Sequence, residues 1–212
     1  MSNIKSNKKL KFILVQIPEL IDPKKSTSGK AKKVAENAIK FLNSIKKPHT
    51  ICEIGKERIR RAGEKIKNDS PLTTENLDIG FRVLKIDDTN MTDVYYSANE
   101  YSQEMLSGLE SNIKPDRTDL DLLFGCLLDW GLPLSMPYTS EQIGNCTVHT
   151  YNNGDLIACF NEDVPETVIR EIANRKPLRA VFRDSSFKDS PSKINVTEIF
   201  KTITPDTSVK VI

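Results

Sequence analysis

A chain of 212 residues with 38% hydrophobic residues is long enough to form one ordinary domain with a real core, or one domain and a fragment of another. The sequence has no signal-peptide pattern and no apolar stretch near the roughly 20 residues that a membrane helix needs, so we expect no membrane anchor. The four cysteines form no CxxC pair, which argues against a zinc site or a disulfide framework and favours a reduced, cytoplasmic setting.

Charge divides the sequence into two parts. Residues 1–67 contain 18 Lys and Arg against 6 Asp and Glu, a formal charge of +12, whereas residues 68–212 contain 13 against 23, a formal charge of −10. Such an asymmetry predicts two structural units, of which the basic one faces phosphate or an acidic partner. A lysine-rich face exposed to solvent explains the same numbers equally well.

The basic part is predicted to contain one strand and two helices. Residues 11–17 (KFILVQI) are a continuous apolar run ended by Pro18, which is typical of a strand buried on both faces of a parallel sheet. The patterns over 29–45 and 50–67 are helical. Because the strand is followed by helices and not by further strands, we expect the sheet to which it belongs to be missing from this chain.

A polar stretch over 68–76, which contains Pro71, predicts the boundary between the two parts. Residues 80–86 (GFRVLKI) then alternate as in a half-buried strand. Residues 87–117 are weakly patterned, and we predict mostly loop there, with a short helix over 103–109.

The clearest helix signal in the chain begins at Thr118, which with Asp121 resembles a capping box, and ends before Gly131 and Pro133. Its apolar stripe is predicted to be core, and Trp130 is a candidate partner anchor only if exposed. The stripe comprises Leu120, Leu123, Phe124, Leu127 and Leu128.

Downstream, residues 146–160 contain two apolar runs around Asn152-Asn153-Gly154, and they predict a hairpin because Asn and Gly tolerate positive φ angles. The remaining elements expected are helices near 165–175 and 194–203 and strands near 179–183 and 208–211. The whole pattern is that of an α/β protein.

No self-contained active site is predicted. The glycines form neither a GxGxxG turn nor a P-loop, and the carboxylates show no pairing for acid–base chemistry. His49 and His149 are isolated in sequence and are interpreted as surface or core residues. For Arg58, Arg60 and Arg61 two interpretations remain, contacts to DNA phosphates and salt bridges within the protein.

Seven segments that span nearly the whole chain carry a family resemblance. They are KFILVQIPE (11–19), EIGKERIRRAGEKI (53–66), LDIGFRVL (77–84), DLLFGCLLDWGLPL (121–134), GDLIA (154–158), AVFRDSSFKD (180–189) and NVTEIFKTITPDTSVK (195–210). In this order they resemble the C-terminal part of the modification subunit of type III restriction-modification systems, a DNA adenine N6-methyltransferase. The resemblance implies a fragment of a Rossmann-like methyltransferase sheet over 1–67, a linker over 68–77, and a smaller α/β domain over 78–212.

Members of this family transfer a methyl group from S-adenosylmethionine to adenine in double-stranded DNA, after turning the base out of the duplex. A D/N-P-P-Y sequence binds the base, and an FxGxG turn lets the backbone approach the cofactor. Neither occurs here, since Met136-Pro137-Tyr138 lacks the preceding Asp-Pro and nothing before Lys11 resembles the glycine turn. No catalytic residue and no metal ligand is therefore assigned.

The resemblance leaves one edge of the cofactor site, the end of the strand over 11–17, where such folds place a polar side chain against the ribose hydroxyls. Gln16 aligns best with that position, and Glu19 is the charged alternative. The other interpretation is that Gln16 pairs with backbone and that Glu19 is a solvated turn residue. Without the glycine turn, we expect weak or absent binding of S-adenosylmethionine.

The leading interpretation is a truncated or split modification subunit that is inactive alone. The partners implied are double-stranded DNA, a second modification subunit or an N-terminal methyltransferase fragment, and the restriction subunit. A non-enzymatic module for subunit association or DNA binding is the second interpretation, and an idle product of an interrupted gene is the third.

Overall fold

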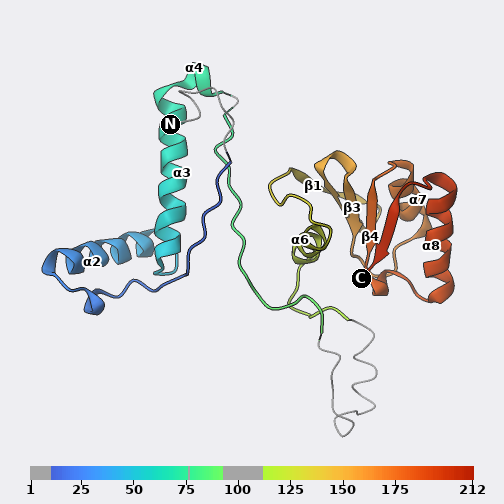
Figure 1. The fold of residues 1–212 in the computed structure, drawn as a ribbon, viewed down its shortest axis with the longest axis horizontal. Helices are drawn as coiled ribbons and strands as arrows, with labels where there is room; N and C mark the ends of the chain where they lie inside the picture. The colour runs from blue at the N-terminus through green and yellow to red at the C-terminus, as the bar shows by residue number, and fades with distance from the viewer. Residues whose placement is uncertain (1–10, 76, 93–111) are drawn as a thin grey trace, which may run out of the picture. The chain divides into compact units, whose positions relative to one another are not determined.

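The structure is a computed structural model that describes residues 11–75, 77–92 and 112–212 (Figure 1). The chain divides into two compact units, which we call unit 1 (residues 1–83) and unit 2 (residues 84–212). Its fold class is mixed α/β, as expected. No helix in the described ranges is both long and apolar enough to cross a membrane.

Unit 1 is helical in its described part. Its elements are the short 3-10 helix η1 (Pro23–Lys25) and the helices α2 (Gly29–Ser44), α3 (Ile51–Asp69) and α4 (Pro71–Thr74). The predicted helices over 29–45 and 50–67 are confirmed as α2 and α3. The predicted linker over 68–77 contains the end of α3 and all of α4.

Capping and close packing explain where these helices begin and how they are held. The Ser28 side chain accepts a hydrogen bond from the backbone N–H of Ala31 at 3.2 Å, which satisfies one free donor at the start of α2. In α3, a Cβ added at Gly63 would lie 2.9 Å from the Cβ of Ile79. The segment after α4 can therefore return along α3 only because residue 63 has no side chain.

Residues 11–17 do not form a strand in this structure. The only bridge of the segment 11–20 joins Leu20 to Thr50, and the apolar side chains before it are open to solvent. The expected strand over 80–86 is also absent, and Ile86 is fully exposed. The physical reason is shared, because a strand needs a neighbour for its backbone N–H and C=O groups and none of the described strands lies beside either segment.

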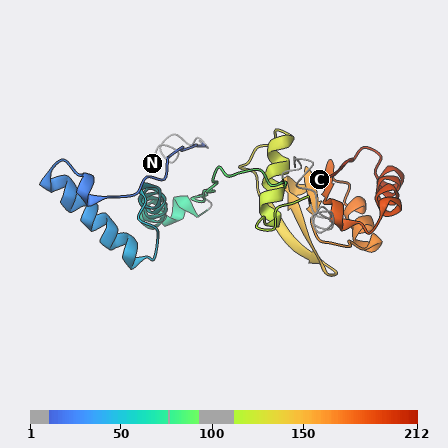
Figure 2. The same cartoon turned by 90° about the horizontal axis from the view of Figure 1, so that it is seen from below.

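Unit 2 contains a sheet packed between helices (Figures 1 and 2). The sheet order is β1-β2-β3-β4-β5, antiparallel over the first three strands and parallel over the last three. The elements are α6 (Asp119–Asp129), β1 (Tyr138–Ile143), β2 (Cys146–Tyr151), η2 (Asn152–Gly154), β3 (Leu156–Cys159), α7 (Glu166–Asn174), β4 (Arg179–Phe182), η3 (Asp184–Ser186), α8 (Ser190–Ile203) and β5 (Ser208–Val211). The predicted hairpin, the two C-terminal helices and the two C-terminal strands are confirmed.

Alternation along the strands builds two cores, one on each face of the sheet. In β3, Ile157 and Cys159 pack toward α7 and α8, whereas Leu156 and Ala158 pack toward α6. β4 alternates in the same way. All of β3 is buried, as expected for a central strand covered on both faces.

The capping box that begins α6 is confirmed. Thr118 Oγ1 accepts a hydrogen bond from the Asp121 N–H at 3.3 Å, and Asp121 Oδ2 accepts one from the Thr118 N–H at 2.8 Å. The predicted apolar stripe was wrong at its edges, because Leu120 and Leu128 are 37% and 65% exposed. The face that meets the sheet consists of Leu122, Leu123, Cys126 and Leu127.

The predicted turn at 152–154 is confirmed, and all three of its residues have positive φ. The sequence prediction missed β1, which pairs with β2 through a turn at Gly144. The sequence of β1, YTSEQI, is mostly polar and its four central residues are exposed, so the apolar alternation that marks a strand is absent. The helix expected over 103–109 lies outside the described residues.

Candidate functional site

The two predicted cofactor residues lie on the exposed segment before η1. Gln16 Nε2 donates a hydrogen bond to the backbone carbonyl of Ile17 at 3.1 Å, and the side chains of Gln16 and Glu19 are both exposed. The Glu19 backbone carbonyl accepts a hydrogen bond from the N–H of Ile51 at 3.0 Å. The segment is thereby joined to the first turn of α3.

Cys52 strengthens that junction. Its Sγ lies 3.7 Å from the backbone carbonyls of both Gln16 and Ile17, the geometry of a weak thiol hydrogen bond. Gln16 and Glu19 therefore lie on one short segment of backbone, which precedes the helices α2 and α3. Neither side chain lines the cavity of unit 2 that is described below.

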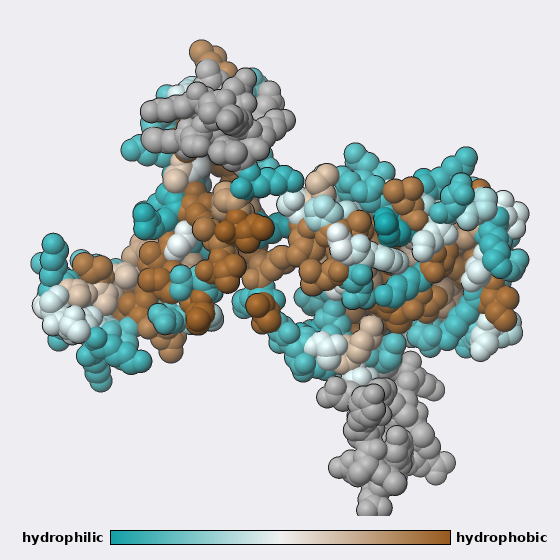
Figure 3. Space-filling model, viewed as in Figure 1, coloured by the Kyte–Doolittle hydropathy of each residue, from teal (hydrophilic) through white to brown (hydrophobic). Residues whose placement is uncertain are grey.

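Apolar exposure is the most unusual property of this segment. The exposed fractions are 59% for Phe12, 91% for Ile13, 70% for Leu14, 89% for Val15, 72% for Ile17 and 75% for Leu20. Successive residues of an extended chain point to opposite sides, so both sides of the segment are apolar. Figure 3 shows hydrophobic residues at the surface of unit 1. Exposed apolar runs of this kind are typical of surfaces that contact another molecule.

The arginines of α3 are used mainly within the protein. Glu57 forms ion pairs with Arg60 at 3.4 Å and with Arg61 at 2.8 Å, and the hydrogen bond from Arg61 lowers the pKa of that carboxyl. The Arg60 guanidinium also lies over the ring of Phe81, and that of Arg61 over the ring of Phe41. These contacts support the interpretation of Arg60 and Arg61 as structural residues. Arg58 is exposed.

His149 is a buried residue with polar partners on both ring nitrogens. Ser140 Oγ lies 2.8 Å from Nδ1, and Asp119 Oδ2 lies 3.3 Å from Nε2. His149 is only 4% exposed, and its ring lies against the ring of Phe160. No sequence pattern predicted this cluster, because Ser140 and Asp119 lie 9 and 30 residues from His149.

A serine, a histidine and a carboxylate in a row resemble the parts of an activated nucleophile. The surroundings of Ser140 do not fit that role. Ser140 lies on the edge strand β1, and the cavity that Asp119 lines is lined by neither Ser140 nor His149. We therefore interpret the cluster as a polar link between the N-terminus of α6 and the β1–β2 hairpin.

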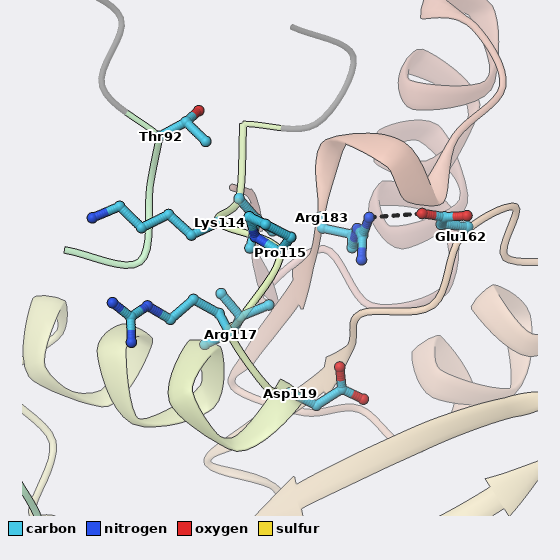
Figure 4. Close-up of a pocket in the computed structure, with 9 residues that line it drawn as sticks. Thr92, Lys114, Pro115, Arg117, Asp119, Glu162 and Arg183 are labelled. Atoms are coloured by element: carbon cyan, nitrogen blue, oxygen red, sulfur yellow. Dashed lines mark hydrogen bonds and ion pairs between the residues drawn. The ribbon is translucent and has the colours of Figure 1, made fainter. Parts of the chain in front are cut away.

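One cavity in unit 2, shown in Figure 4, has a volume of about 420 Å³. Its lining residues are Thr92, Ile113, Lys114, Pro115, Arg117, Asp119, Leu122, Glu162 and Arg183. The three cations are neutralised locally, since Lys114 pairs with Asp88, Arg117 with Asp87, and Arg183 with Glu162. Each basic side chain of the lining thus has a carboxylate partner within unit 2.

Trp130 is half-buried at the end of α6. The side chains of Arg179 and Lys210 lie over its ring, at 5.8 and 5.5 Å from the ring centroid. The indole is therefore covered by cations of its own unit, which argues against its use as a partner anchor.

The four cysteines lie within residues 11–75, 77–92 and 112–212, the part of the chain that the structure describes. All four cysteines are free, and no group of three potential metal ligands occurs among the described residues. Burial raises the pKa of the Cys126 thiol to about 11 and that of Cys159 to about 12. Both thiols therefore stay protonated and unreactive at neutral pH.

Comparison with known proteins gives no assignment. No protein family, no curated protein and no solved structure matches this chain significantly.

Proposed function

We propose that these residues are the C-terminal part of a DNA adenine N6-methyltransferase of the type III modification-subunit kind. In this proposal residues 11–17 complete a Rossmann-like sheet whose other strands lie outside these 212 residues. The methyl donor is S-adenosylmethionine and the substrate is double-stranded DNA. The base-binding and glycine-turn motifs are absent from this sequence, so the chain by itself transfers no methyl group.

One observation carries the proposal: the exposed apolar segment over 11–17. An isolated segment with five apolar residues open to water on both sides is unfavourable, because burying one such side chain is worth about 1.5–3 kcal/mol. A central strand of a parallel sheet removes both sides from water and also satisfies the backbone. The segment thus has the composition of a strand whose sheet is elsewhere.

Unit 2 then serves as the accessory domain. Its core is closed on both faces of the sheet, and its clustered polar residues form internal links, as in the pairs of the cavity. Association with a second modification subunit or with a restriction subunit is the role that the resemblance implies. The proposed setting is the cytoplasm, where the four free cysteines remain reduced.

Methyl transfer tests the proposal. Duplex DNA and labelled S-adenosylmethionine are incubated with this chain alone, with a family polypeptide that carries the D-P-P-Y and FxGxG motifs but lacks this region, and with both. We expect label on adenine only in the mixture. Label in the first reaction, or none in the third, contradicts the proposal, and a stable but inactive complex in the third favours the association module.

The same mixture distinguishes the two cofactor candidates. If one side chain binds the ribose hydroxyls, its replacement by alanine raises the KM for S-adenosylmethionine about 10- to 100-fold, the effect of losing about 1.5–3 kcal/mol of hydrogen bonding. Gln16→Ala and Glu19→Ala serve as matched controls for each other. An unchanged KM in both variants supports the interpretation of Gln16 and Glu19 as surface residues.

A further inference from the structure

The two units use their basic residues differently. In unit 2, eight of the twelve lysines and arginines form ion pairs with carboxylates, as Lys193 does with Asp184. In unit 1, residues 22–47 contain eight lysines and only two acidic residues, Asp22 and Glu36. None of these eight lysines forms an ion pair within the described part of the chain. Positive charge thus accumulates on η1, α2 and the segment after α2.

The lysines of α2 share one side of the helix. At 3.6 residues per turn, Lys30, Lys32, Lys33 and Lys40 fall within an arc of about 160°. The opposite arc contains the apolar residues, among which Leu42 is completely buried within unit 1. The four lysines are exposed. The apolar side of α2 is thus packed in part, with Leu42 buried, Phe41 partly buried and Val34 63% exposed, whereas the lysine side is open to solvent.

Glu36 is the only acidic residue on this side of α2. It lies four residues before Lys40, a spacing that favours an ion pair on a helix, yet no such pair is formed. The net charge of the lysine side is therefore +3, and nothing described in unit 1 neutralises it.

We propose that the lysine side of α2 binds the phosphate backbone of duplex DNA. From Lys30 to Lys40 the stripe extends about 15 Å along the helix axis, a length over which duplex DNA carries about nine phosphate charges. Lysine suits this role because its compact charge needs no fixed geometry, so the contact carries no sequence information. The choice of DNA over another polyanion rests on the proposed function.

A membrane surface fits this helix less well. Helices that lie on membranes insert a broad apolar side into the lipid boundary, whereas on α2 Leu42 is buried and Phe41 partly buried, which leaves Val34 as the large apolar side chain exposed on this helix. The lysines are therefore available to a charged surface without an apolar contact. Binding to an acidic protein is distinguished by the experiment.

The test is the salt dependence of DNA binding by the full chain. Fluorescence anisotropy with a labelled 20-base-pair duplex is measured over a series of salt concentrations, for the wild type and for K30Q/K33Q/K40Q. The slope of log K against log salt is negative, and each lost phosphate contact reduces its magnitude by about 0.9, so we expect the magnitude to fall by about 2.7 in this variant. Glutamine has a helix propensity close to that of lysine, and circular dichroism checks that α2 is retained.

A matched control removes the same charge from unit 2. Lys85, Lys176 and Lys188 are exposed and form no ion pair among the described residues, and K85Q/K176Q/K188Q should reduce the magnitude of the slope by less than about 1. Equal slopes for the two triple variants, or no salt-dependent binding by the wild type, overturn the proposal. A tenfold preference for polyglutamate over duplex DNA as competitor overturns it as well, in favour of an acidic protein.

This test is independent of methyl transfer. If DNA binding depends on the lysines of α2 but no mixture methylates DNA, the DNA-binding surface is retained and the proposed function is wrong. If a mixture methylates DNA and K30Q/K33Q/K40Q binds as tightly as the wild type, the surface fails alone.

Discussion

The exposed segment over 11–17 allows a paired experiment on how it docks. Ile13 and Val15 point to one side of an extended chain and Phe12 and Leu14 to the other. Replacing each pair by serine gives two variants, I13S/V15S and F12S/L14S. Ile13 and Val15 are 91% and 89% exposed, so their replacement should change the free energy of unfolding of this chain by less than about 0.5 kcal/mol.

Docking should respond strongly to the same changes. If the segment becomes a central strand, each of the four side chains is buried on binding, at about 1.5–3 kcal/mol per residue. Each pair therefore contributes about 3–6 kcal/mol, which corresponds to a Kd roughly 10²- to 10⁴-fold weaker in either variant. The assay is titration of the fluorescently labelled chain with the family polypeptide that carries the catalytic motifs.

The two variants also distinguish two modes of binding. A strand buried on both faces requires both pairs, whereas a segment that lies along a surface requires one. A change below about fivefold in both variants refutes the sheet-completion reasoning. A large increase of the Kd in only one variant would show that the segment docks along the surface of its partner, with one side buried.

Three further predictions concern the fold and its polar links. Replacing His149 by alanine should cost about 2–4 kcal/mol in urea unfolding, because a buried ring and two hydrogen bonds are lost, while Ser140→Ala should cost less than about 1 kcal/mol since water replaces the exposed hydroxyl; equal costs would show that the cluster is wrongly interpreted. Thr118→Ala should cost about 1 kcal/mol at neutral pH by removing the cap. The hydrogen bond from Thr118 lowers the pKa of Asp121, so this carboxylate stabilises the fold above its unfolded pKa and ceases to do so as pH falls through the lowered value. The difference in melting temperature between wild type and Thr118→Ala should therefore narrow below about pH 4. A thiol-reactive disulfide reagent at pH 8 should modify Cys52 in the native chain and all four cysteines in denaturant. Rapid reaction of Cys126 or Cys159 in the native chain would contradict the burial that raises their pKa values.

Much of the fold could be predicted from sequence because its signals are local. The helices α2, α3, α7 and α8 each carry an apolar side with helical spacing, and the turn at 152–154 carries residues that tolerate positive φ. The cap of α6 was predicted from Thr118 and Asp121 alone. These features depend on neighbours within four residues, which a sequence pattern contains.

The errors occur where a distant partner decides the outcome. The alternating segment over 80–86 lacks a neighbouring strand, whereas the polar β1 becomes a strand because β2 supplies its hydrogen bonds. The buried side of α6 is set by the sheet beneath it, which exposes Leu128. In each case the residues themselves were compatible with both outcomes.

In the candidate site, too, features set by neighbours in sequence were predicted and features set by distant residues were not. Sequence placed Gln16 and Glu19 on one short segment, but the cluster around His149 depends on residues far apart in the chain. Likewise, the pattern KERIRR indicated the arginines of α3 as candidate phosphate contacts. The structure shows that Arg60 and Arg61 form ion pairs with Glu57, so the lysines of α2 are the better candidates. Composition gives the amount of charge, and contacts decide how much of it remains available.

The strand order of unit 2 has a consequence for how the chain acquires its structure. Each strand lies beside its predecessor in sequence, from β1 to β5, and the parallel pairs are connected through α7 and α8. The sheet can therefore form one strand at a time in chain order, starting from β1. No later strand has to insert between two strands that formed earlier. We expect this unit to begin folding during synthesis, with the hairpin β1–β2 already paired when α8 leaves the ribosome.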